Sequence, residues 1–174
     1  MRLTDTLPQT IATERLLLRA PRMSDAEALV TEANNWKVLE PTANLPFPYL
    51  PEHAEGFITR AAHKPGQRSY VIAGSGDDRL KGVIGFYFFE DRPVELGYWL
   101  GESHWGQGLA PEAVTGLVEA AEALGITPIR ARVLAGNAAS VRVLQKTGFV
   151  VIEETLSVVE RHRGRPLLLM ERRR

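Results

Sequence analysis

The segment HWGQGLAPEAV, residues 104–114, places two glycines around a glutamine where a helix is expected to begin. A glycine-containing loop exposes backbone N–H groups, and the first helical turn leaves about four more unpaired at the positive end of the helix dipole. Such a corner suits anions, and phosphates in particular. The same glycines also fit a simple tight turn. The sequence has no Walker loop and no Gly-x-Gly-x-x-Gly motif, so the neighbouring residues must decide.

A second polar group begins at Asn137, in the segment NAASVRVLQKTGF. Asn137 is placed to cap a helix with its side-chain oxygen, and it also fits that structural role alone. Ser140 and Leu144 follow at spacings of three and seven, which puts all three residues near one helix face. A serine at this position is often only solvated or bonded to the backbone.

A lone carboxylate, Glu95, interrupts the otherwise apolar segment VELGYWL. By strand alternation it shares a face with Gly97 and Trp99, where it could accept a proton through water as a general base. The competing interpretation is a solvated carboxylate, or one paired with Arg92 or with a neighbouring strand. Both interpretations stay open at this stage.

The elements that must position these residues follow from apolar periodicity, turn residues and caps. Ser24 with Glu27 forms a capping-box pattern for the first helix, Pro111 lies in the first turn of a later helix, and Gly125 ends it. Strands are expected at residues 15–21, 69–74, 80–90, 94–101, 129–136, 149–160 and 165–172, and helices from 24, at 52–63, 110–125 and 137–148.

The expected element order is therefore βααβββαβαββ, with an antiparallel meander in the middle and a closing hairpin at the end. This order predicts an α/β (or α+β) fold with helices on both faces of a mixed sheet. The 174 residues suffice for one domain with a full core, and we expect residues 1–174 to form a single domain.

Composition excludes several classes of function. Lys plus Arg equals Asp plus Glu, which argues against a broad nucleic-acid or membrane-binding face, so an anion must be held locally. The chain has no cysteine, so disulfides and thiol nucleophiles are excluded. Its four histidines show no metal-ligand spacing, and we expect no metal. No signal peptide or membrane span is recognisable, and a cytoplasmic location is expected.

Together, ELGYWLGESHWGQGLAPEAV and NAASVRVLQKTGF resemble the acetyl-CoA-binding core of the GNAT acyltransferases. The similarity is greatest to the RimJ/RimL-type branch, the ribosomal-protein N-terminal acetyltransferases, and extends from TERLLLRAPRMSDAEAL to the final hairpin. It implies a GNAT-like, mostly antiparallel sheet of about seven strands with about four helices, and acetyl-CoA as cosubstrate. A homodimer is one assembly that the resemblance leaves open.

The resemblance also implies roles for individual residues. Asn137 would reach the coenzyme, and the backbone of Trp99 and Leu100 would pair with the pantetheine amides. One residue departs from the family pattern: Trp105 stands where Gln or Arg is usual, so weaker or altered binding is expected. The pyrophosphate would be held by the N–H groups of Gly106, Gln107, Gly108, Leu109 and Ala110.

Acetyl transfer to an amine requires a base, oxyanion stabilisation and help for the departing thiolate. The tyrosine that many relatives use as the acid corresponds here to Leu144, whereas the serine proposed for the RimJ/RimL-like branch corresponds to Ser140. We therefore expect Ser140 and Glu95 to be catalytic. Without a cysteine to carry the acetyl group, a direct ternary complex is expected.

The acceptor amine, a protein N-terminal α-amine or a small-molecule amine, is not specified by the sequence. The alternative function is a non-catalytic acyl-CoA-binding or regulatory module, favoured by Leu144 and Trp105. Weaker candidates for the base or for holding the amine are Glu102 and His104. Candidates for an acceptor-side wall are Trp36, Phe47 and Tyr49, and a basic turn that could attract an acidic acceptor carries Arg161, Arg163 and Arg165.

Overall fold

The fold is built on one eight-stranded sheet with strand order β1-β2-β3-β4-β5-β6-β8-β7. The computed structural model describes residues 3–173, so residues 1, 2 and 174 of the expected domain lie outside the described residues. All neighbouring strands pair antiparallel except β5 (Val94–Leu100) and β6 (Ile129–Leu134), which run parallel. The predicted mixed, mostly antiparallel sheet is confirmed.

The other elements have the following bounds. The remaining strands are β1 (Ile11–Ala12), β2 (Leu16–Arg19), β3 (Gln67–Gly74), β4 (Leu80–Tyr87), β7 (Val150–Leu156) and β8 (Pro166–Arg172). The α-helices are α1 (Leu3–Thr6), α2 (Ala26–Ala33), α3 (Trp36–Leu39), α4 (Pro51–Ala61), α5 (Leu109–Ala123) and α6 (Ala138–Lys146). Short 3-10 turns cover Met23–Asp25, Glu102–His104 and Glu160–His162.

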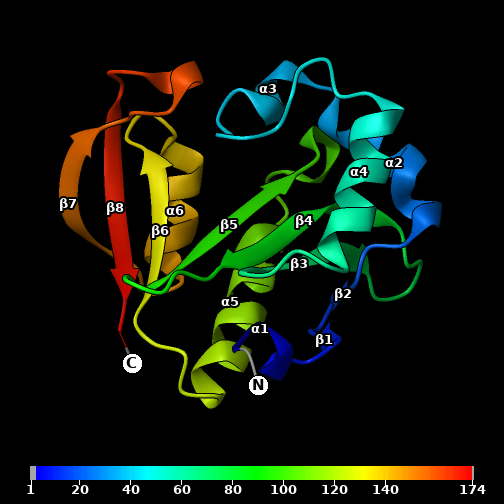
Figure 1. Ribbon diagram of the computed structural model, residues 1–174, viewed down its shortest axis with the longest axis horizontal. Coiled ribbons are helices and arrows are strands. Elements are labelled where there is room, and N and C mark those ends of the chain that lie inside the picture. Colours follow the sequence, from blue (N-terminus) through cyan, green and yellow to red (C-terminus); the bar gives the residue numbers. More distant parts are fainter. Residues whose placement is uncertain (1–2, 174) are drawn as a thin grey trace.

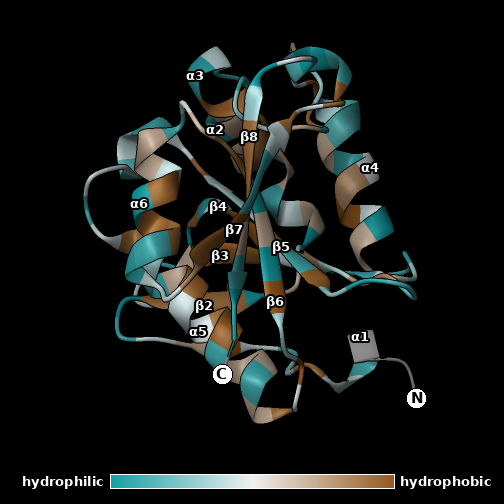
Figure 2. Cartoon of the chain, turned by 90° about the vertical axis from the view of Figure 1, so that its left-hand side faces the viewer, coloured by the Kyte–Doolittle hydropathy of each residue, from teal (hydrophilic) through white to brown (hydrophobic). Residues whose placement is uncertain are grey.

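The helices cover both faces of the sheet, as predicted. Helices α2 and α4 pack on one face, and α5 and α6 pack on the other (Figure 1). Figure 2 shows α4 and α6 on opposite sides of the strands, each carrying both hydrophobic and hydrophilic residues. An amphipathic helix buries one stripe against a sheet, so this arrangement gives a three-layer fold.

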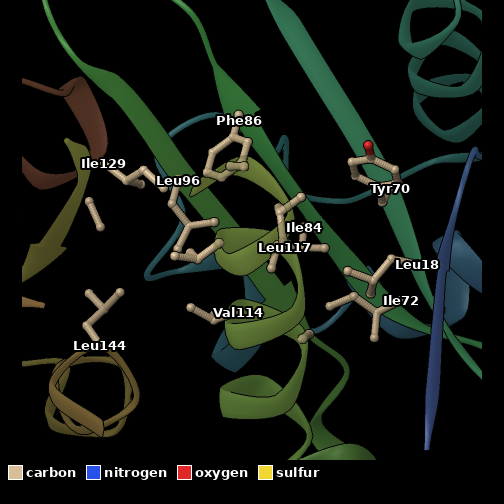
Figure 3. Close-up of a cluster of buried hydrophobic side chains, with 14 of the residues drawn as sticks. Leu18, Tyr70, Ile72, Ile84, Phe86, Leu96, Val114, Leu117, Ile129 and Leu144 are labelled. Atoms are coloured by element: carbon tan, nitrogen blue, oxygen red, sulfur yellow. The ribbon is translucent and has the colours of Figure 1, made fainter. Parts of the chain in front are cut away.

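The larger core lies between the sheet and helices α5 and α6. Figure 3 shows Val114 and Leu117 of α5 beside Ile84 and Leu96 of the central strands. All four side chains are at most 5% exposed. Because cores are packed as densely as organic crystals, this layer fixes the start of α5 relative to β5.

The predicted order of the longer elements is confirmed, and the short α1, β1 and α3 are additional. The predicted capping box of Ser24 and Glu27 is wrong, because a 3-10 turn precedes α2 and Asp25 is the residue that closes it. The Asp25 carboxylate accepts a hydrogen bond from the Arg22 N–H at 2.7 Å and is paired with the buried Arg19 at 2.9 Å. A carboxylate accepts these charged hydrogen bonds better than a hydroxyl does.

Candidate active site

The glycine corner is a left-handed loop that leads directly into helix α5. Gly106 and Gly108 have φ values of +71° and +75°, a region that residues with a Cβ rarely adopt. Gly108 is the residue that precedes the first turn of α5, and residues 105–108 are exposed. Among residues 3–173, no protein acceptor takes the N–H groups of 106–110. The corner therefore combines a turn that requires glycine with free donors for an anion.

Side chains of the turn between β1 and β2 hold this corner in place, and the sequence analysis did not identify these contacts. The Glu112 carboxylate in α5 accepts hydrogen bonds from the Thr13 hydroxyl (2.6 Å) and from Nε of Arg15 (2.7 Å). Although burial raises it, the hydrogen bonds from Thr13 and Arg15 hold the Glu112 pKa below its usual range. The Arg15 guanidinium also donates to the Gln107 carbonyl at 2.9 Å. A cation is thereby fixed against the loop.

Strands β5 and β6 stop pairing halfway along β5. Their parallel register ends at Leu96 and Ala131, although β5 continues to Leu100 and β6 to Leu134 (Figure 1). Beyond that point β5 stays paired with β4, and β6 stays paired with β8. The two central strands therefore diverge next to the glycine corner.

The backbone of β5 faces this gap at alternate residues. The Gly101 N–H donates a hydrogen bond to the backbone carbonyl of Lys81 in β4 at 2.8 Å. The Leu100 carbonyl accepts a hydrogen bond from the indole N–H of Trp105 at 2.9 Å. Since hydrogen-bonding direction alternates along a strand, the backbone groups of Leu100 and Tyr98 face the gap. The backbone of Trp99 faces β4, so the prediction that it pairs with the pantetheine is wrong, and Tyr98 takes its place beside Leu100. Trp105 thus ties the corner to the end of β5.

On the other side of the gap, helix α6 presents Asn137 and Ser140. The Asn137 side-chain oxygen accepts the Ser140 N–H at 3.2 Å, so the predicted cap is confirmed. The Ser140 hydroxyl lies 2.6 Å from the Tyr98 hydroxyl on β5, a partner that the sequence analysis missed. Burial raises the pKa of Tyr98 to about 12, although the hydrogen bond to Ser140 opposes this shift. Leu144 is buried in the core at 1% exposure.

Glu95 lies on the opposite face of β5 and is ion-paired. Its carboxylate accepts a hydrogen bond from Nε of Arg132 on β6 at 3.1 Å, and Nε of Arg92 lies 3.8 Å from the same carboxylate. Its side chain is 13% exposed. The carboxylate is therefore both paired, as the second interpretation expected, and placed at a cleft, as the first required.

Glu102 and His104 have their own partners outside this chemistry. Glu102 accepts hydrogen bonds from Lys37 and Asn35, both at 2.6 Å. The hydrogen bond from Lys37 holds the Glu102 pKa below its usual range. His104 lies 3.3 Å from the Glu32 carboxylate. These contacts fasten the end of β5 to helices α2 and α3.

The three arginines of the basic turn in the closing hairpin all make contacts within the fold. Arg161 donates to the backbone carbonyls of Leu39, at the end of α3, and of Thr42, in the loop that follows, both at 3.0 Å. The other two arginines pair with carboxylates, Arg163 with Glu160 and Arg165 with Glu40. Of the predicted wall aromatics, Tyr49 is buried in the core, whereas Trp36 and Phe47 are about half exposed and make an edge contact at 5.2 Å between ring centroids.

One cleft of about 1210 Å³ joins these groups across the split in the sheet. Its lining on the α5 and α6 side includes Gly108, Asn137, Ser140, and Leu96, Tyr98 and Leu100 of β5. On the α4 side, the cleft is lined by Tyr87, Glu95, Gly97, Trp99, Arg132, Glu52, Arg60 and Lys64. Residues 3–173 contain no cluster of His, Asp or Glu side chains that could hold a metal ion.

A corner with free backbone N–H groups beside a split sheet, with a hydroxyl on one face and a carboxylate on the other, is an arrangement that suits a coenzyme-A-dependent acyltransferase. The acetyltransferase (GNAT) domain family matches residues 15–150. The chain belongs to the GNAT N-acetyltransferases, and acetyl-CoA is its cosubstrate.

Similar proteins agree with this family assignment. An uncharacterised N-acetyltransferase, YoaA, of Bacillus subtilis (strain 168) is 32% identical over 145 residues, 80% of this chain and 81% of that protein. The ribosomal-protein-serine acetyltransferase of Escherichia coli (strain K12) is 46% identical over 44 residues, 24% of this chain and 25% of that protein. The structure of the microcin C7 self-immunity acetyltransferase MccE with acetyl-CoA and AMP superposes with a TM-score of 0.80 at 17% identity, covering 93% and 94% of the two chains.

No helix within residues 3–173 has the length and apolar character of a transmembrane span.

Proposed function

We propose that this enzyme transfers the acetyl group of acetyl-CoA directly to a primary amine within a ternary complex. The observation that carries the proposal is the single cleft, which runs from the glycine corner through the split sheet to Glu95. Acetyl-CoA enters from the α5 and α6 side, and the acceptor enters from the α4 side. The two substrates then meet where β5 and β6 diverge.

The free N–H groups of Gly106, Gln107, Gly108, Leu109 and Ala110 bind the pyrophosphate, with Arg15 beside them. Asn137 lines the path of the coenzyme. The gap-facing backbone of Tyr98 and Leu100 pairs with the pantetheine amides, and Trp99 contributes its side chain to the acceptor-side wall. Fixing the thioester in this way converts the reaction into an effectively unimolecular attack.

Glu95 accepts the proton of the attacking amine, directly or through a water molecule. The amine nitrogen forms the new bond to the acetyl carbon, and the carbon–sulfur bond breaks as the tetrahedral intermediate collapses. The Ser140 hydroxyl lies on the coenzyme side, where it donates a hydrogen bond to the departing sulfur. Such proton-transfer and hydrogen-bond contributions are typically worth about 100-fold or more in rate.

The acceptor face favours a peptide α-amine or an amino acid over a polyamine. Arg60 and Lys64 line this face without an ion-pair partner among residues 3–173, and Glu52 is the one unpaired carboxylate there. Like charges repel, so a polycation is disfavoured at such a surface. An α-amine that carries neutral or acidic groups meets no such penalty.

The test is calorimetric titration of acetyl-CoA, followed by thiol release with peptides beginning with serine or alanine, free amino acids and spermidine. Binding with amine-dependent thiol release supports the enzyme, and the responsive amine identifies the acceptor class. Binding without release from any of these amines favours the non-catalytic module. Spermidine as the preferred amine would contradict the charge argument, and no binding would contradict the role of the glycine corner.

A homodimer and a cytoplasmic location stay predictions. Support for the homodimer comes from strand β7, which ends the sheet and exposes Val150, Val151, Ile152 and Leu156. An edge strand with exposed apolar side chains is a ready site for pairing with another chain. Sedimentation equilibrium of the wild type and of a Val151→Lys variant tests the pairing, and a wild-type monomer at all concentrations would contradict it.

A further inference from the structure

The hydroxyl pair of Tyr98 and Ser140 is the feature of the cleft that the proposed function leaves unexplained. The two oxygens lie 2.6 Å apart, a short distance for an O–H···O hydrogen bond. They come from elements on either side of the gap, strand β5 and helix α6. Both residues line the cleft. The hydrogen bond therefore joins two groups on the α5 and α6 side of the cleft lining, where the proposed function places the coenzyme.

Which of the two hydroxyls donates its proton decides whether Ser140 can also donate a hydrogen bond to sulfur. A serine hydroxyl has one proton to donate and two lone pairs to accept with. If Ser140 donated to Tyr98, it would have no proton left for a sulfur atom. If Tyr98 donates to Ser140, the serine proton stays free to point into the cleft.

The phenol is the natural donor of the two. A phenol is a stronger acid than an aliphatic alcohol, and the better acid is the better hydrogen-bond donor. Burial keeps the Tyr98 hydroxyl protonated, because it raises the pKa of Tyr98 to about 12. Within residues 3–173 its hydroxyl has no hydrogen-bond partner besides Ser140. We therefore assign Tyr98 as the donor and Ser140 as the acceptor of this hydrogen bond.

We infer that Tyr98 is a positioning residue that acts through Ser140, holding the serine hydroxyl so that its proton points to the sulfur of the departing coenzyme A. This inference rests on the proposed function. A tyrosine on the helix cannot serve here, since Leu144 fills that position in the core. Here the phenol comes from strand β5, and it acts on the sulfur only through Ser140. No proton needs to leave Tyr98, because it only orients a hydrogen bond.

The first test is a double-mutant cycle on the rate of thiol release, with the best amine of the panel above. Tyr98→Phe keeps the ring and removes the hydroxyl, and it is expected to lower kcat about tenfold with little change in the KM for acetyl-CoA, the effect of one hydrogen bond. In a Ser140→Ala background, the change of Tyr98 to Phe should lower kcat by at most about twofold. An equal loss in both backgrounds, or no loss in either, would overturn the inference.

The matched control is Tyr70→Phe on the core strand β3, which β4 separates from β5. The Tyr70 hydroxyl is a buried phenol that donates to the Pro8 carbonyl at 2.6 Å, away from the cleft. This variant is expected to lower thermal stability without changing kcat. A kcat loss equal to that of Tyr98→Phe would show that the effect of removing a buried phenol is only structural.

A second test needs no acceptor and separates this inference from the proposed function. The affinity for coenzyme A is compared with that for desulfo-coenzyme A, which lacks the thiol, by calorimetry from pH 7 to 10. In the wild type the preference for coenzyme A should rise as its thiol ionises, because Ser140 donates to the thiolate. Both single variants should lose that rise. A rise that persists in Tyr98→Phe refutes the inference even if no amine is ever acetylated.

Discussion

Gly108 offers the sharpest test of the anion corner, because the chain contains a matched control for its substitution. Gly108 has φ = +75°, and an added Cβ would lie 3.5 Å from the Arg15 guanidinium, an ordinary contact. Gly125 at the other end of α5 has φ = +76°, and its Cβ would meet nothing within 4 Å. Gly108→Ala and Gly125→Ala therefore carry the same backbone strain without a steric clash.

The strain of a left-handed alanine is about 1–2 kcal/mol. For a chain of this size that lowers the melting temperature by roughly 2–8 °C, and the two variants should fall in this range together. Only Gly108→Ala should also weaken acetyl-CoA binding. If the loop relaxes so that one N–H no longer reaches the pyrophosphate, the loss is about 1.5–3 kcal/mol, roughly 10- to 150-fold in Kd.

Thermal unfolding and calorimetric titration of acetyl-CoA measure the two effects separately. Equal melting temperatures with a selective loss of affinity in Gly108→Ala would confirm that the corner binds the coenzyme through its backbone. Affinity in Gly108→Ala equal to that of Gly125→Ala would refute the reasoning, because the glycines would then serve the turn alone.

Three further predictions concern single contacts. Trp105→Phe removes the indole donor that ties the corner to β5 and should raise the acetyl-CoA Kd about 2- to 10-fold by titration; an unchanged Kd would show that the loop holds itself. Glu95→Gln should lower kcat about 100-fold at unchanged acetyl-CoA Kd, whereas Arg132→Gln, which breaks the same ion pair but keeps the carboxylate, should not; equal losses would argue against a base. Glu171→Gln should cost about 1.5 kcal/mol at pH 7 in denaturant unfolding, since the hydrogen bond from Arg130 holds the Glu171 pKa below its usual range. The wild type has this contribution in full above the ordinary glutamate pKa and loses it as the pH falls through the lowered pKa, so the difference in unfolding free energy should close there, and a constant difference would contradict the prediction.

The sequence predicts those parts of the site that depend on local patterns. The glycine corner, the start of α5 and the Asn137 cap are each determined by residues within a few positions of one another. Turn and cap preferences are short-range steric and hydrogen-bonding effects, so they are visible without the fold. The element order follows for the same reason, because periodicity reports burial of each segment.

Contacts between distant segments could not be predicted in this way. Tyr98 and Ser140 are 42 positions apart, and Arg15 and Glu112 are 97 apart. Both pairs depend on which strands are neighbours and in what register. A tyrosine in an apolar strand is usually a core residue, so nothing in the pattern around Tyr98 distinguished it.

The Glu95 case shows why two interpretations could both hold. The ion pair to Arg132 depends on the parallel register of β5 and β6. This register places Glu95 opposite Arg130, and Arg132 lies two residues further along β6 on the same face. The access to the cleft depends on that register ending one residue later. Strand alternation alone gave the face of Glu95 but could not say where the pairing stops.

The end of that pairing is what connects the fold to its chemistry. Strands β5 and β6 each keep a full partner on the outer side, β4 and β8, so the sheet stays intact while its centre opens. Backbone groups that face such a gap need partners, and a ligand with amides along its length can provide them. The corner and the hydrogen bond from Trp105 to Leu100 lie at the end of β5, beyond its last residue paired with β6. We therefore expect a pantetheine arm that starts from the corner to run down the gap, toward the paired end of the strands, where Glu95 and Arg132 lie on the far face.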